Sequence, residues 1–165
     1  MPSSILRSLA EQAMAAARRR GLSIVTAESC TAGALSTLLS EAPGAAEHLQ
    51  GGFVTYTKAN KTKSLGVPSG LLRSRGAVCA EVARAMAEGA LAHSAGDLAV
   101  AITGVAGPEP DEDNNPVGLV CIAVAQTGRD TVDLRKEYGA IGRDQVRARA
   151  MEDALREVIR TAEAE

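Results

Sequence analysis

A serine stands in the sequence where a nucleophile could act, between a predicted strand and the start of a predicted helix. It is Ser29, within the run Thr26–Gly33, which reads Thr-Ala-Glu-Ser-Cys-Thr-Ala-Gly. Backbone N–H groups at the start of a helix have no partner within the helix, and the helix dipole favours negative charge there. Such a position suits a nucleophile whose tetrahedral intermediate carries an oxyanion. Ser29 or Thr31 could instead serve only as the N-cap of the helix.

Cys30 is a rival nucleophile next to Ser29. A helix N-terminus lowers the pKa of a thiol and so raises its reactivity. The alternative is a buried and inert cysteine.

A serine nucleophile needs a base, and the two histidines, His48 and His93, are expected on the surface, away from strand ends. A lysine can serve instead when desolvation or neighbouring cations lower its pKa. Three lysines cluster after the second predicted strand: Lys58, Lys61 and Lys63. Tyr56 precedes them and could position the proton. Without a partner, the same lysines would form a solvated basic helix.

Two more segments offer groups for binding a substrate. The run Thr103–Pro108 follows a wholly apolar predicted strand, and its glycines expose backbone donors and acceptors, unless it is a plain turn. Arg143 and Arg147 stand one turn apart at the start of the last predicted helix, where the helix dipole disfavours a cation. They could clamp a phosphate or form a structural ion pair with Glu152 or another carboxylate. The acidic run Asp111–Asp113 has no metal-ligand spacing and is expected to be a solvated loop tip.

The elements that must position these residues follow from hydrophobic periodicity and turn residues. Helices are predicted from a cap at Ser3 or Ser4 to an end in Arg18–Arg20, over Ala34–Ser40, around Lys61 to an end at Gly66, over Ala80–Ala92 and over Arg143–Ala162. Strands are predicted over Leu22–Thr26, Phe53–Thr57, Leu98–Thr103, Val117–Ala125 and Thr131–Glu137, the last two joined as a hairpin. This order predicts a three-layer α/β/α sandwich with a mixed, mostly parallel sheet.

Composition narrows the class of protein. The 165 residues, expected to form a single domain over 1–165, are 45% hydrophobic and 23% charged, with a net charge of −2. The lack of a basic surplus and the 2% aromatic content argue against nucleic-acid binding. No apolar run is long enough for a membrane span, and the three separate cysteines form neither a disulfide framework nor a metal site. We therefore expect a cytoplasmic protein.

Five ordered blocks of the chain resemble the C-terminal domain family of the competence-damage-inducible protein CinA. The blocks are Thr26–Gly33; Tyr56 with Lys61 and Leu65–Val67; Gly76–Val78 with Glu81–Ala83 and Met86–Ala87; Ala101–Pro108 with Pro116–Gly118; and Arg143 with Arg147. Three places depart from the family pattern. The segment Glu109–Asn115 replaces a glycine-rich loop and a lysine, Ile141–Gly142 replaces Gly-Asp, and Cys79 replaces a serine.

The resemblance implies an amidohydrolase that converts nicotinamide mononucleotide to nicotinate mononucleotide and ammonia. It implies a catalytic group of Ser29, Lys61 and Tyr56, and a substrate-binding role for Arg143, with Arg147 as a second candidate. We further expect Cys30, Thr31, Thr103 and Gly104 to contact the nucleotide substrate, with no cofactor and no metal, in a homo-oligomer. The alternative is a nucleotide-binding or interaction module that kept the fold without the catalysis.

Overall fold

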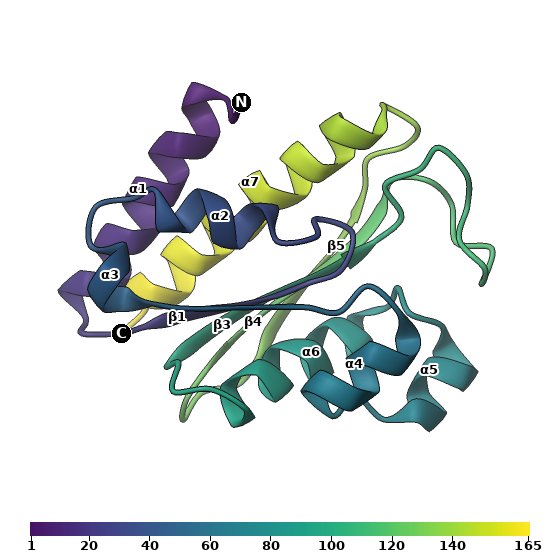
Figure 1. The fold of residues 1–165 in the computed structure, drawn as a ribbon, viewed down its shortest axis with the longest axis horizontal. Coiled ribbons are helices and arrows are strands. Elements are labelled where there is room, and N and C mark those ends of the chain that lie inside the picture. Colours follow the sequence, from purple (N-terminus) through teal and green to yellow (C-terminus); the bar gives the residue numbers. More distant parts are fainter.

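Five strands form one mixed sheet through the middle of the protein, and the computed structural model describes all 165 residues (Figure 1). The strands are β1 (Ile24–Glu28), β2 (Leu49–Val54), β3 (Leu98–Gly104), β4 (Leu119–Gln126) and β5 (Val132–Glu137). Their order across the sheet is β2-β1-β3-β4-β5. Strand β1 is parallel to β2 and β3, and β4 is antiparallel to β3 and β5, so only β4 runs against the others. The predicted mixed, mostly parallel sheet is confirmed.

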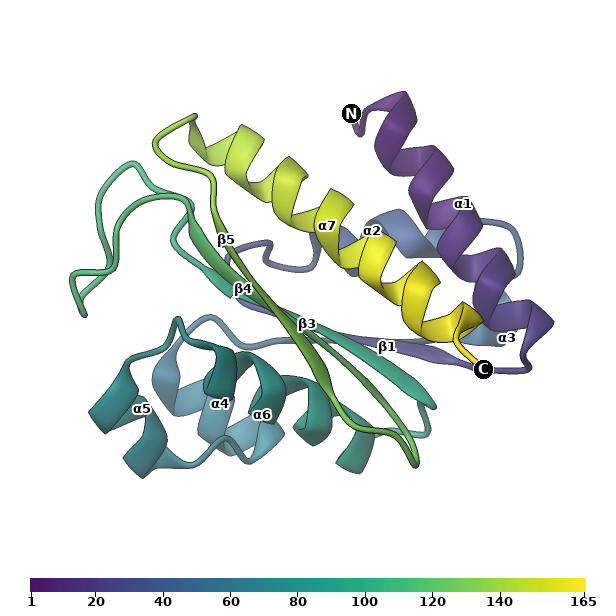
Figure 2. The ribbon, with the colours of Figure 1, turned by 180° about the vertical axis from the view of Figure 1, so that it is seen from behind.

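Helices cover both faces of this sheet, as the three-layer prediction requires (Figures 1 and 2). One face carries α1 (Ser4–Arg19), α2 (Ala34–Ser40), α3 (Ala45–His48) and α7 (Arg143–Glu163). The other carries α4 (Lys58–Leu65), α5 (Ser69–Arg75) and α6 (Ala80–Ala92). None of the helices combines the length and the apolar character that crossing a membrane requires.

Alternating strand residues divide the core into two halves. Ile24, Val100 and Ile122 pack with α1, α2 and α7, whereas Val25 and Ala99 pack with α6 and the end of α4. Side chains on successive strand residues point to opposite faces, so a strand covered on both faces must be apolar throughout. The fully apolar pattern of the third predicted strand indicated this, and β3 is buried along its whole length up to Gly104.

The second strand lies earlier than the sequence predicted, and two helices were missed. Strand β2 ends at Val54 and contains Gly51 and Gly52, which the prediction had placed before the strand. A Cβ atom at Gly52 would collide with Thr26 Oγ1, so glycine lets β2 lie close to β1. Helices α3 and α5 are too short for a clear apolar period, and α5 starts directly after Pro68.

The turn that carries Ser29 is held by a buried carboxylate. Glu28, the last residue of β1, is fully buried and accepts hydrogen bonds from the backbone N–H groups of Leu35 (2.9 Å) and Ser36 (3.0 Å) in the first turn of α2. Thr26 Oγ1 donates a third, at 3.2 Å. The N-cap residue of α2 is Gly33, which has no side chain to cap the helix. The alternative in which Ser29 or Thr31 is the N-cap is therefore wrong, because Glu28 supplies the acceptor.

We expect Glu28→Gln to destabilise the protein by about 1–3 kcal/mol. The amide of glutamine would place its NH₂ group against the buried N–H of Leu35 or Ser36, and the charge-assisted character of the remaining bond would be lost. Urea unfolding measures the change. Glu11→Gln, at an exposed position of α1, is the matched control and should change stability by less than about 0.5 kcal/mol. Equal unfolding midpoints for the two variants would contradict the assigned role of Glu28.

Candidate active site

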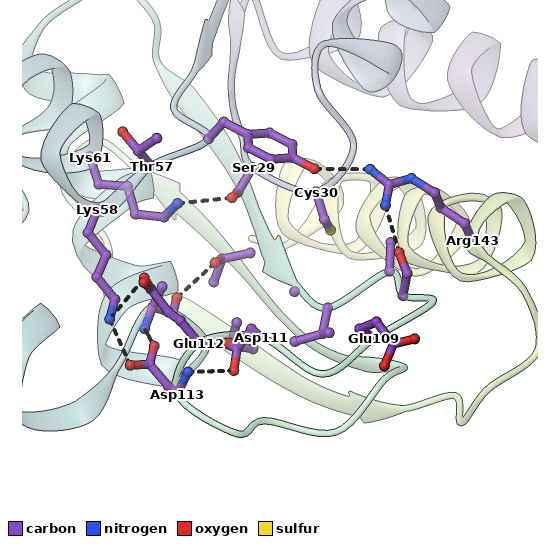
Figure 3. Close-up of a pocket in the computed structure, with 18 of the residues that line it drawn as sticks. Ser29, Cys30, Thr57, Lys58, Lys61, Glu109, Asp111, Glu112, Asp113 and Arg143 are labelled. Carbon is purple, nitrogen blue, oxygen red and sulfur yellow. Dashed lines mark hydrogen bonds and ion pairs between the residues drawn. The ribbon is translucent and has the colours of Figure 1, made fainter.

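A cavity of about 590 Å³ opens beyond the carboxyl ends of β1 and β3 (Figure 3). In open α/β sheets, ligands bind at such strand ends. The turn after β1, the start of α4, the loop after β3 and the first residue of α7 form its walls. Seven of the nine predicted catalytic and substrate-binding residues line it together: Ser29, Cys30, Tyr56, Lys61, Thr103, Gly104 and Arg143.

Ser29 and Lys61 form the centre of this site. Lys61 Nζ donates a hydrogen bond to Ser29 Oγ at 2.9 Å and another to the backbone oxygen of Thr55 at 2.8 Å. The backbone N–H of Ser29 donates to the carbonyl of Ile102 on β3, at 2.9 Å, which fixes the serine against the central strand. The two side chains come from residues 32 positions apart and meet only in the fold. Geometry of this kind is what a nucleophile and its base require.

The environment of Lys61 suits a base. The residue is only 1% exposed, and no carboxylate is bonded to its amine. Burial, assisted by the positive charge of Lys58, lowers the pKa of Lys61 from 10.5 to about 8. Desolvation disfavours the charged form of an amine, so a substantial fraction of Lys61 is neutral slightly above neutral pH. The prediction of a solvated basic helix is wrong for this lysine, although Lys63 is exposed.

Cys30 does not have the properties of a nucleophile. Burial raises the pKa of its thiol to about 11, although Arg147 and Lys61 act in the opposite direction. The reactive thiolate is therefore scarce at neutral pH. The two histidines lie outside the cavity lining, and their Nδ1 atoms pair with the backbone oxygens of Leu22 and Gly89.

The backbone beside Ser29 offers donors for an oxyanion. The N–H groups of Cys30, Thr31 and Gly33 have no acceptor within the protein, and Cys30 lines the cavity. In many hydrolases, the N–H of the residue after the nucleophile contributes to the oxyanion hole. The N–H of Cys30 occupies that place here.

Arg143 reaches the cavity from the first position of α7. Its Nη1 donates to the backbone oxygen of Gly107 at 2.6 Å, and its Nη2 donates to the hydroxyl of Tyr56 at 3.0 Å (Figure 3). Both acceptors are neutral, and no carboxylate pairs with the guanidinium, so the suggested ion pair with Glu152 is absent. The hydroxyl of Tyr56, a residue that is 54% exposed, contacts Arg143 rather than Ser29 or Lys61. A catalytic role for Tyr56 remains a prediction.

Two predicted substrate contacts lie outside the cavity lining. Thr31 is buried, and Arg147 donates from Nε to the backbone oxygen of Cys30 at 2.8 Å. Arg147 thus supports the turn that carries Ser29. Within the cavity, Thr103 donates its hydroxyl proton to the backbone oxygen of Ala77 at 2.8 Å, which ties the end of β3 to the segment before α6.

The acidic loop is exposed at Glu112 and Asp113, as predicted for a solvated tip, and it also contributes to the cavity. Its lining includes Glu109, Asp111, Glu112 and Asp113. The last two pair with Lys58, which lies in the first turn of α4. No role at the site could be predicted for these residues from the sequence, because nothing in the local pattern pairs Lys58 with a loop 55 residues away. No group of three or more His, Cys, Asp or Glu side chains in the protein has a metal-binding arrangement.

Comparisons with known proteins agree on one family. The family described as the CinA C-terminal domain matches residues 6–162. A CinA-like protein of Geobacter sulfurreducens is 43% identical over 131 residues, covering 79% of this chain and 31% of that protein. A CinA-like protein of Synechococcus sp. is 43% identical over 150 residues, covering 90% of this chain and 36% of that protein. The chain thus spans about a third of the length of these curated relatives.

Solved structures show the same fold over nearly the whole chain. The competence/damage inducible protein CihA from Agrobacterium tumefaciens superposes with a TM-score of 0.93 at 36% identity, covering 97% of both chains. A competence-damaged protein (CinA) superfamily protein from Escherichia coli gives a TM-score of 0.90 at 31% identity, covering 98% of this chain and 93% of that one.

The buried amine predicts how stability depends on pH. Because the pKa of Lys61 is about 8 in the folded protein, against 10.5 for a lysine in water, folding opposes protonation. This cost is present in full below pH 8 and disappears as the pH rises past 10.5. We therefore expect Lys61→Met to be more stable than the native sequence at pH 7, by up to about 3 kcal/mol at about 1.4 kcal/mol per pKa unit, and the gap to close by pH 10.5.

Urea unfolding between pH 6 and 10.5 measures this difference. Lys63→Met, on the exposed side of the same helix, controls for the loss of a lysine. A difference between Lys61→Met and the native sequence that stays constant over this range would contradict a buried amine with a lowered pKa.

Proposed function

The chain belongs to the family of CinA C-terminal domains, and from this membership and the geometry of the cavity we propose that it is an amidohydrolase. The proposed reaction is hydrolysis of the carboxamide of nicotinamide mononucleotide, which gives nicotinate mononucleotide and ammonia. The observation that carries the proposal is the 2.9 Å hydrogen bond between Lys61 Nζ and Ser29 Oγ in a buried setting that lowers the pKa of the lysine to about 8. A lysine that only stabilises a fold gains nothing from such a setting, whereas a base for serine needs it.

Acylation of Ser29 is the first stage of the proposed reaction. Neutral Lys61 accepts the Ser29 hydroxyl proton as Oγ attacks the carboxamide carbon. The resulting tetrahedral intermediate carries its negative charge on the former carbonyl oxygen. The N–H of Cys30, unpaired in the protein and adjacent to the nucleophile, donates to that oxyanion.

Release of ammonia and hydrolysis complete the cycle. The protonated Lys61 gives its proton to the amide nitrogen as the C–N bond breaks, leaving the nicotinoyl group esterified to Ser29. Lys61, neutral again, then removes a proton from a water molecule that attacks the ester carbon. Breakdown of this second intermediate frees the carboxylate and returns the proton to Ser29 Oγ.

Arg143 is the proposed partner of the phosphate of the substrate. It lines the cavity, and its guanidinium donates only to neutral acceptors, the Gly107 carbonyl and the Tyr56 hydroxyl. A guanidinium fixed in this way keeps further N–H groups for a phosphate and loses little freedom on binding. Tyr56 is then a positioning residue for the phosphate end, in addition to any part in proton transfer.

We expect Ser29→Ala to lower the rate of ammonia release from nicotinamide mononucleotide by about three orders of magnitude or more while leaving the fold intact, as when other serine nucleophiles are removed. Ser40→Ala, at an exposed position of α2, is the matched control and should keep the native rate. A near-native rate for Ser29→Ala together with loss of activity in Cys30→Ala would show that the wrong nucleophile is assigned.

The same assay run from pH 6 to pH 10 tests the base. The ratio kcat/KM should fall below about pH 8, where Lys61 becomes protonated in the free enzyme. If the native protein binds the nucleotide but releases no ammonia at any pH, the alternative of a binding module without catalysis replaces the proposed reaction.

Arg143→Ala should selectively weaken binding of the nucleotide substrate. Loss of a charge-assisted contact costs about 1.5–3 kcal/mol, which is roughly one to two decades in affinity. The KM for nicotinamide mononucleotide should therefore rise, whereas the rate with nicotinamide riboside, which lacks the phosphate, should hardly change. Equal losses on both substrates would mean that Arg143 acts at the carboxamide or in folding.

A further inference from the structure

Lys58 lines the same cavity as Ser29, yet its charge is already neutralised by the loop between β3 and β4 (Figure 3). Its Nζ lies 2.7 Å from Asp113 Oδ1 and 3.2 Å from Glu112 Oε1. The side chains of Lys58 and Asp113 are only 29% and 25% exposed. The pair is partly exposed to water, and its attraction is that of a well-formed surface ion pair.

The position of Asp113 is fixed by more than Lys58. The backbone N–H of Ala77 donates to Asp113 Oδ2 at 3.2 Å, and Gly76 lies so close that a Cβ atom there would press on the carboxylate. The loop is also braced internally, because Asp111 accepts from the backbone N–H groups of Asp113 (3.0 Å) and Asn115 (2.8 Å). Asp113 is therefore held opposite Lys58 by the local fold.

The ionisation of this pair is mutually supported. The hydrogen bond to Asp113 raises the pKa of Lys58, and the hydrogen bond from Lys58 lowers the pKa of Asp113. Both groups are charged at neutral pH, so the pairing persists under ordinary assay conditions.

Arg143 is the only cation at the cavity that remains available to an anionic ligand. Of the three cationic residues in the lining, Lys61 is bonded to Ser29 and the Thr55 carbonyl, and Lys58 is paired with two carboxylates. Glu109 and Asp111 add further negative charge to the same loop. A second anionic group on a ligand would meet carboxylates there, because the lining offers it no other exposed cation without a carboxylate partner; Lys61 is buried.

We propose that Asp113 and Glu112 mask Lys58 and thereby restrict this cavity to ligands that carry one anionic group. The residues determine specificity and do not touch the reacting atoms. The substrate class that fits is a mononucleotide bound at Arg143, and the class rejected is one with a diphosphate, such as a dinucleotide. This inference rests on the proposed function for its substrate, but the masking itself is a property of binding and can be tested without catalysis.

The test is to unmask Lys58 with the double variant Glu112→Gln/Asp113→Asn, which keeps the shapes of both side chains. Calorimetric titration with nicotinamide adenine dinucleotide and with nicotinamide mononucleotide measures the two affinities. We expect the double variant to bind the dinucleotide about tenfold tighter or more than the native protein, while the mononucleotide changes less, because one phosphate contact to a freed lysine is worth at least a decade.

Adding Lys58→Met to the double variant should abolish the gain, because the freed amine is its source. The matched control is Asp133→Asn, which breaks a similarly exposed pair with Arg84 (2.8 Å) outside the cavity lining and should leave both affinities unchanged. No gain in the double variant, or a gain that persists without Lys58, would overturn the proposal. Since binding is the readout, a protein that fails to release ammonia would refute the proposed reaction and leave this test unaffected.

Discussion

The burial of one amine beside one hydroxyl is the constraint on which the arrangement of this protein depends. Lys61 is removed from water, and its amine finds only Ser29 Oγ and a backbone carbonyl as partners. Keeping it there requires α4 to pack tightly. Gly89 in the last turn of α6 allows this, because a Cβ atom at that position would collide with the Leu65 carbonyl at the end of α4. A glycine inside a helix costs about 1 kcal/mol relative to alanine, so the close approach of the two helices offsets a real penalty.

The serine side of the pair is fixed by a different device. Glu28 ends β1 and binds the first turn of α2, so the residues between them form a short turn with little freedom. Ala32 and Gly33 take positive φ angles in that turn, and Arg147 holds the Cys30 carbonyl from α7. The nucleophile is therefore positioned by groups from β1, α2 and α7, whereas the base arrives on α4 from the opposite face of the sheet. The site forms where the two helical layers meet at the strand ends.

Much of the fold could be predicted from the sequence, because hydrophobic periodicity reports which residues face the core. The bounds of α2 and α6 were predicted as they occur, and the buried strand β3 was recognised from its unbroken apolar run. Strand β2 was misplaced because its glycines resemble a turn when their neighbours are unknown. Ser29 could be nominated from its place at a strand end. Spacing alone could not select its partner among Lys58, Lys61 and Lys63, because desolvation is a property of the folded protein. The family resemblance pointed to Lys61.

The charges around the cavity show why it matters that Lys61, and not Lys58, is the base for Ser29. Lys58 and Lys61 lie three positions apart on α4, and the charge of the first lowers the pKa of the second. Were Lys58 unpaired, it would also attract anionic groups toward the end of the cavity that holds the base. Asp113 and Glu112 limit both effects, since they neutralise Lys58 on the side facing the loop. Arg143 then offers the only exposed cation without a carboxylate partner, on a different wall of the cavity. Desolvation lowers the pKa of Lys61 at one end of the cavity, and the guanidinium of Arg143 can receive an anion at the other. A neutral base and a charged anion site therefore exist in the same cavity without competing.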